Sequence, residues 1–233
     1  MNKSNSCICL FPLTPVFNTD FVPVFESMST DDSSLLKSIL YENFVEVLNN
    51  IADSSTNIFC IDEKDKDKIS PDIEHLVPGI TWIDTSVLNN ELKNISDKYF
   101  KKFQNNVIIF ADSIGISDQD IRKIFSLLEM EDESFLIGRD NDERIALIGF
   151  NTFNEELLGN IVEDRNNYNE MLIKASKNEN FVHTLNNFMV IETKEDFKKL
   201  YTELSKKESL NYCSQSIHEK FTHLFIEYKD LLK

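Results

Sequence analysis

The stretch VIIFADSIGIS, residues 107–117, and the stretch FLIGRDNDERIALIGF, residues 135–150, decide how this chain folds. In the first, an apolar run ends at one carboxylate, Asp112, which predicts a buried strand with an acidic group at its carboxyl end. In the second, apolar residues up to Gly138 and again from Ile145 flank six polar residues, which predicts a strand, a polar turn and another strand. Together the two stretches indicate the active-site edge of an α/β sheet.

The composition agrees with one α/β domain, alone or with an added subdomain. The chain has 233 residues, of which 41% are hydrophobic, and this is enough to form a core. The 18 Phe, against one Trp and six Tyr, indicate a core filled by large rings. Five Gly are few for a protein that cradles phosphates in glycine loops, which counts against a Walker or Rossmann site.

Charge and cysteine usage narrow the class of protein. A formal net charge of -16 and a pI near 4.6 argue against nucleic-acid binding, which depends on clustered Lys and Arg. The four cysteines, Cys7, Cys9, Cys60 and Cys213, show no CxxC spacing and mostly sit within apolar runs. They are therefore predicted to be buried, reduced thiols of a cytoplasmic protein.

No segment has the pattern of a membrane span, because no apolar stretch reaches the ~18 residues needed to cross a bilayer. Residues 7–24 are apolar enough to resemble a short signal peptide. However, Pro12, Pro15 and Pro23 interrupt them, and no small-residue cleavage site follows. A first core strand that leads into an irregular loop explains this segment better.

Strand and helix patterns alternate along the chain, which predicts a mostly parallel central sheet flanked by helices. Besides the strands of the two opening stretches, strands are predicted at residues 7–11, 57–61, 79–83 and 188–191. Helices are predicted at residues 34–51, 87–103, 118–129, 155–177, 195–204 and 214–232. The run EKDKDK at residues 63–68 is interpreted as solvated, and Ser117 with Asp120 resembles a capping box.

The C-terminal end is expected to be an addition to the sheet domain. We divide the chain into an α/β domain over residues 1–210 and an amphipathic helix over residues 211–233. The helix carries a wide apolar stripe, for which two arrangements remain open. It packs back on the domain, or it forms a homodimer with a second copy.

Asp112 allows a functional and a structural interpretation. At the carboxyl end of a buried strand, a carboxylate is well placed to hold a hard divalent cation against phosphate oxygens. Alternatively, Asp112 or Ser113 simply opens a turn by hydrogen-bonding to nearby backbone. A receiver-like or flavodoxin-like domain shares such a strand-end aspartate, but it does not explain the second stretch.

The two stretches are similar to the motifs of a known family. Residues 110–117, FADSIGIS, resemble G-S-D-x-P-G-L-T after a strand, and residues 138–149, GRDNDERIALIG, resemble G-P-A-x-D-G-G-Y-Y-L-I-G. Both motif aspartates are retained as Asp112 and Asp142, and three of the chain's five glycines fall on motif glycines. More faintly, residues 192–197 resemble a late D-x-D-T-P-E-D-L motif.

These motifs are typical of a bacterial glycosyltransferase-like family of unknown function, associated with radical-SAM or selenodomain proteins. The resemblance implies the GT-A nucleotide-diphospho-sugar transferase fold, with a nucleotide sugar or nucleotide as partner. It further implies Mg or Mn bound by Asp112 and Glu192, and substrate contacts from three residues of the motifs: Ser113, Asp142 and Arg144. Two residues at the end of the opening strand, Phe11 and Pro12, would contact the nucleotide.

Departures from the motifs leave the activity open. The loop over residues 13–24 holds no Lys or Arg, although the family carries K-T-R-L there to bind phosphates. The diglycine is replaced by Glu143 and Arg144, and Val190 stands where a metal-binding Asp is expected. Two hypotheses follow: a divergent, metal-dependent glycosyl- or nucleotidyltransferase, and a degenerate, catalytically inactive member that keeps the fold for binding or assembly.

Overall fold

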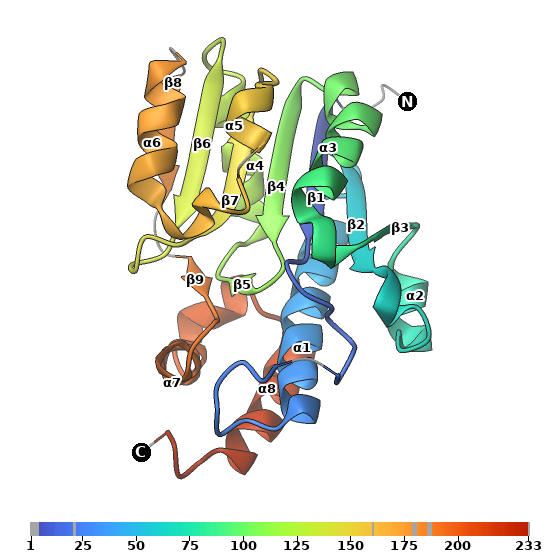
Figure 1. Ribbon diagram of the computed structural model, residues 1–233. Helices are drawn as coiled ribbons and strands as arrows, with labels where there is room; N and C mark the ends of the chain where they lie inside the picture. Colours follow the sequence, from blue (N-terminus) through green and yellow to red (C-terminus); the bar gives the residue numbers. More distant parts are fainter. Residues whose placement is uncertain (1–4, 21, 160, 179–180, 186–187, 233) are drawn as a thin grey trace.

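The computed structural model describes residues 5–20, 22–159, 161–178, 181–185 and 188–232. Its centre is a seven-stranded sheet with the strand order β3-β2-β1-β4-β7-β6-β8 (Figure 1). The strands of this sheet are β1 (Ser6–Phe11), β2 (Thr56–Asp62), β3 (Ile80–Ile83), β4 (Asn105–Phe110), β6 (Ser134–Arg139), β7 (Ile145–Phe150) and β8 (Phe181–Leu185). A second, two-stranded sheet joins β5 (Ser113–Ile114) to β9 (Met189–Val190).

Most strands of the large sheet run in one direction. β1 is parallel to β2 and β4, β2 is parallel to β3, and β6 is parallel to β8. Only β7 runs against its two neighbours, β4 and β6. Every residue of β1, β4 and β7 is buried, as expected for central strands covered on both faces. The predicted α/β fold with a mostly parallel, helix-flanked sheet is confirmed.

Helices cover both faces of this sheet and form one hydrophobic core on each side. On one face pack α1 (Thr30–Asn49), α2 (Pro71–Leu76) and α4 (Asp118–Leu128). On the other pack α3 (Leu88–Lys98), α5 (Glu155–Gly159) and α6 (Tyr168–Lys177). Alternate residues of β1 enter the two cores, with Ile8 and Leu10 on the α1 side and Cys9 and Phe11 on the α3 side.

The last two helices, α7 (Lys194–Leu204) and α8 (Gln215–Glu227), lie beyond the carboxyl end of β4 (Figure 1). Their apolar faces meet the first half of α1 in a third core, where Phe197, Phe221 and Phe225 pack together. Tyr228 adds polar contacts, since its hydroxyl donates to Asp32 Oδ2 over 2.6 Å. The apolar stripe of the C-terminal helix thus lies inside the chain's own core.

Several elements differ from their predicted bounds for identifiable reasons. α1 begins at Thr30 because the Ser29 side chain caps it, and the helix predicted at residues 155–177 is divided into α5 and α6. The edge strand β8 was not predicted, and the segment at 188–191 forms only the short β9.

The capping box of Ser117 and Asp120 is confirmed, and all four cysteines are buried and free. None of the helices in the described ranges has the length and hydrophobicity needed to cross a bilayer.

Candidate functional site

Asp112 follows β4, and the backbone around it brings in a second carboxylate. The Ser113 hydroxyl donates to the Phe110 carbonyl over 2.7 Å, which is the turn chemistry expected of this position. The Asp112 carbonyl accepts a hydrogen bond from the Ile191 amide over 2.9 Å, beside the β5–β9 pairing. This pairing places Glu192 next to Asp112, so residues far apart in sequence share one strand-end site.

A buried arginine connects these two carboxylates. Arg165 belongs to a short 3₁₀ helix, Asp164–Asn166, and is only 2% exposed. Its guanidinium nitrogens lie 2.5 Å from Asp112 Oδ1 and 2.9 Å from Glu192 Oε1. The third guanidinium nitrogen, Nε, donates to the Ile145 carbonyl over 3.0 Å, and the group stacks 4.9 Å from the centre of the Phe110 ring. All three guanidinium nitrogens of Arg165 are therefore engaged.

Arg144 forms a second cationic centre in the turn between β6 and β7. It binds Asp196 through nitrogens at 2.6 and 2.8 Å, and it binds Asp140 at 2.7 Å. Burial alone would lower the pKa of Arg144, but hydrogen bonds and charges from Asp196 and Asp140 outweigh it and raise that pKa above its usual value. Arg144 also lies 3.7 Å from Glu192. It is a structural ion-pair partner rather than a solvated turn residue.

These contacts form one connected cluster, which we call the arginine–carboxylate network: Asp112, Asp140, Arg144, Arg165, Glu192 and Asp196. Asp142 lies at its rim with a side chain that is 53% exposed, paired with Lys199 at 2.6 Å. Glu143 adopts the left-handed conformation, with φ 65°. The glycine that the family motif prefers at Glu143 thus suits the backbone itself.

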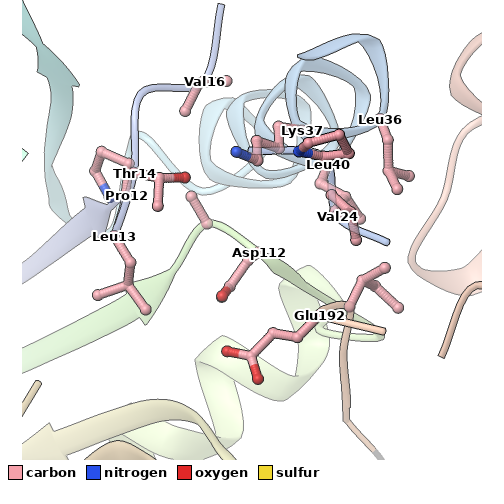
Figure 2. Close-up of a pocket in the computed structure, with 13 residues that line it drawn as sticks. Pro12, Leu13, Thr14, Val16, Val24, Leu36, Lys37, Leu40, Asp112 and Glu192 are labelled. Atoms are coloured by element: carbon pink, nitrogen blue, oxygen red, sulfur yellow. The ribbon is translucent and has the colours of Figure 1, made fainter. Parts of the chain in front are cut away.

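A cavity of about 240 Å³ opens beside this network (Figure 2). Its walls are mostly apolar and come from the loop after β1, from α1 and from the segments after β4 and β9. Figure 2 shows Asp112 and Glu192 on one side of the cavity and Lys37 of α1 on the opposite side. Of the residues predicted to bind ligand, Pro12, Asp112 and Glu192 line the cavity, whereas Phe11 points into the core on the α3 side of the sheet.

The residues present do not fit the divalent metal that the motifs imply. The facing oxygens of Asp112 and Glu192 are taken by one guanidinium, and a metal ion would need that same space. Val190, at the position of a further metal-binding carboxylate, is buried and apolar. In the part of the chain that the structure describes, no three His, Cys, Asp or Glu side chains come together to hold a metal ion.

Three polar residues of this region were not predicted from the sequence to belong to the site. Arg165 comes from the segment predicted as one helix over residues 155–177, and Lys37 comes from α1. Asp65 lies in the charge run that was interpreted as solvated, but it is fully buried. Its two carboxylate oxygens accept from the amides of Val16 and Phe17 over 2.7 and 3.1 Å, so Asp65 fixes the loop that walls the cavity.

We expect the wild-type chain to lose stability relative to the Asp65→Asn variant as the pH rises from 4.5 to 7.5. Burial raises the pKa of Asp65 to about 6, against the lowering effect of the Val16 and Phe17 amides. The folded state therefore binds the Asp65 proton more tightly than the unfolded chain does. The stabilisation that comes from this protonated carboxyl is complete below a pH of ~4 and is lost as the pH rises to ~6. Across that window the loss is roughly 2–3 kcal/mol.

Urea unfolding at pH 4.5, 5.5, 6.5 and 7.5 measures this effect as the difference between variant and wild type. The matched control is Asp67→Asn, an exposed aspartate of the same charge run, which should leave the slope unchanged. Identical slopes for Asp65→Asn and the wild type would show that Asp65 does not titrate in this window.

The fold that these elements define is that of the nucleotide-diphospho-sugar transferase-like proteins. A putative nucleotide-diphospho-sugar transferase from Desulfovibrio desulfuricans G20 superposes with a TM-score of 0.74 at 19% identity, over 98% of this chain and 97% of that one. A homologue of Mycobacterium tuberculosis Rv0371c, from Mycobacterium sp. strain JC1, gives a TM-score of 0.51 at 11% identity, over 86% and 97% of the two chains. No family model and no curated protein matches the sequence significantly.

Proposed function

We propose that this chain is a degenerate member of the nucleotide-diphospho-sugar transferase fold, which keeps the strand-end cavity for binding or assembly and performs no metal-dependent transfer. One observation carries this proposal: the Arg165 guanidinium bridges Asp112 and Glu192 at 2.5 and 2.9 Å. The two side chains that the family resemblance assigns to the metal thereby already share a cation from within the protein.

The electrostatics of the network support this view. Transfer from a nucleotide sugar develops negative charge on a leaving diphosphate, which needs a cation beside it. In the arginine–carboxylate network two guanidinium groups face four carboxylates, so the network keeps two excess negative charges. Asp142 and Lys199 add one charge of each sign. A diphosphate would be repelled by this wall rather than bound.

The finer family assignment belongs to the same proposal. The motif residues Asp112, Gly115, Asp142 and Gly149 support a divergent member of the bacterial radical-SAM- or selenodomain-associated type. Gly138 supports it less specifically, because a Cβ there would lie 2.6 Å from Leu147 and Phe188, so packing alone requires glycine. The buried free cysteines fit a reducing, cytoplasmic compartment, and the acidic charge fits a protein without a nucleic-acid partner.

One observation favours the competing function, an active metal-dependent glycosyl- or nucleotidyltransferase. The side chains of Asp112 and Glu192 remain 23% and 33% exposed at the cavity, so ligand can approach them. Activity of this kind requires Arg165 to leave both carboxylates when a metal ion arrives. The Arg165 side chain would then have to break two short ion pairs, although it is almost fully buried.

Calorimetry with Mn²⁺, alone and with UDP-, GDP- and CDP-linked sugars, tests the proposal. We expect no saturable heat for Mn²⁺ up to about 1 mM, which corresponds to a binding free energy weaker than about -4.1 kcal/mol. Asp112→Asn serves as the matched variant, and it should behave as the wild type does. Saturable Mn²⁺ binding that this variant loses, or release of sugar from a nucleotide sugar that depends on Asp112, would establish the competing function.

A further inference from the structure

The loop after β1 walls the cavity without a basic residue, but α1 supplies one from the other side. Lys37 lines the cavity and is half-buried, among walls formed largely by Leu36, Leu40, Val16 and Val24. Among the described residues, no carboxylate lies within 4.0 Å of its ammonium group. Lys37 is therefore a cation that faces a cavity without a direct ion-pair partner in the described part of the chain.

We propose that Lys37 anchors an anion in this cavity, and that the cavity binds, without metal, a compact molecule with one anionic group on an apolar body. This inference rests on the proposed function, because it takes the cavity as a binding site in which no metal ion takes part. The anchor is a lysine from a helix and not from the loop that carries the basic residues of the family motif.

The charged groups around Lys37 limit how much negative charge the cavity accepts from a ligand. On the far side, Asp112 and Glu192 are already bound to Arg165, so they do not neutralise Lys37 directly. Burial lowers the pKa of Lys37, and the more distant charges of Asp112 and Asp65 act against this lowering. Burial removes water molecules that would hydrate the Lys37 ammonium. An anionic group of the ligand would supply charge-assisted hydrogen bonds in place of that lost hydration. A second anionic group would meet the acidic wall across the cavity.

The remaining walls define the body of the ligand. Nine of the lining residues are apolar, among them Leu13, Val24, Leu40 and Ile191. The cavity of about 240 Å³ is below the ~300–1,000 Å³ of sites for drug-sized ligands, so a single ring or a short branched chain fits it. A ring that bears one carboxylate has this combination of size, charge and hydrophobicity, and a ring that bears one phosphate monoester matches it in size but carries up to about two negative charges.

Binding of benzoate, phenyl phosphate, UDP and the neutral benzyl alcohol, measured by calorimetry and ligand-observed NMR on the full chain in EDTA, tests the inference. We expect benzoate or phenyl phosphate to bind at least tenfold more tightly than benzyl alcohol, and the preferred anion distinguishes a carboxylate from a phosphate ligand. UDP should bind more weakly than the preferred anion. Lys37→Met should weaken anion binding at least tenfold, and Lys37→Arg should retain it.

Lys123→Met, an exposed lysine of α4, is the matched control and should bind as the wild type does. Circular dichroism must show that Lys37→Met remains folded, which the half-buried position favours. The inference is overturned if none of the anions binds, or if Lys37→Met binds them as tightly as the wild type. Because EDTA excludes metal, these outcomes are separate from failure of the proposed function, which would show as Mn²⁺ binding through Asp112.

Discussion

Replacing Arg165 by methionine should lower the free energy of unfolding by about 3 kcal/mol, because two carboxylates then lose the cation between them. Breaking a buried ion pair costs roughly 3–5 kcal/mol when a charge is left without a partner. The low end applies here, since Asp112 and Glu192 keep side-chain exposures of 23% and 33%. Methionine fills much of the arginine's volume and keeps a favourable contact with the Phe110 ring.

The same variant should acquire a response to Mn²⁺ that the wild type lacks. With Arg165 gone, Asp112 and Glu192 face each other across space that a divalent cation can occupy. Mn²⁺ at a concentration of ten times its dissociation constant would raise the free energy of unfolding of Arg165→Met by about 1.4 kcal/mol. Urea unfolding with Mn²⁺ and with EDTA measures both effects.

The matched control for this experiment is Arg122→Met. Arg122 lies exposed on α4, donates to the Ser54 hydroxyl and lies 3.8 Å from Asp53. Its replacement should change stability by less than about 0.5 kcal/mol and should not create a response to Mn²⁺. If Arg165→Met were as stable as Arg122→Met, the guanidinium would not be the cation that holds the two carboxylates together.

Phe221→Ala should cost about 3–5 kcal/mol, the usual loss for a large ring removed from a core. Phe221 is fully buried at the centre of the third core, stacked against Phe225 at 6.1 Å. If this core belongs to a single chain, the unfolding midpoint of the wild type should not change over a tenfold range of protein concentration. A homodimer joined through the same apolar stripe would give a midpoint that rises with concentration.

Ile226→Ala provides the control on the same helix, because Ile226 is 56% exposed. It should change stability by less than about 0.5 kcal/mol. A loss below 1 kcal/mol for Phe221→Ala would contradict the packing of α8 on α1. Urea unfolding monitored by circular dichroism gives all of these values.

The sheet was predictable where the hydrophobic pattern is strong. β4 and β7 are fully buried, and their apolar runs at residues 107–110 and 145–150 indicate strands without further information. β8 was missed because it is an edge strand without a fully buried residue, so FVHTL has no clear alternation. The helix predicted over residues 155–177 is divided, although apolar residues recur at helical spacing along it, and the 3₁₀ helix Asp164–Asn166 lies between its two parts. There Arg165 bonds the Ile145 carbonyl, Asp112 and Glu192.

The site was predictable in part, namely in Pro12, in Arg144 and in the carboxylates of Asp112 and Glu192. Asp112 follows a buried strand, and the family motif indicates Glu192, but their partner Arg165 is fixed by tertiary contacts that leave no local pattern. Lys37 is different, because it precedes Leu40, Tyr41 and Phe44 at helical spacing and so lies toward the buried face of α1. A lysine on the buried face of an amphipathic helix is a sequence pattern that indicates a site residue. For Asp65 the prediction was wrong in the opposite direction: the charged run at residues 63–68 was interpreted as solvated, but Asp65 within it is buried.

The hydrogen bond from the Ile191 amide to the Asp112 carbonyl makes the spacing of the two carboxylates a property of the backbone. It helps to set the spacing of Asp112 and Glu192 through the backbone, together with the β5–β9 pairing, so that spacing does not depend on which cation lies between the carboxylates. Replacement of Arg165 therefore need not disturb the scaffold that holds the two carboxylates, because Arg165 lies on a short 3₁₀ helix outside the sheet.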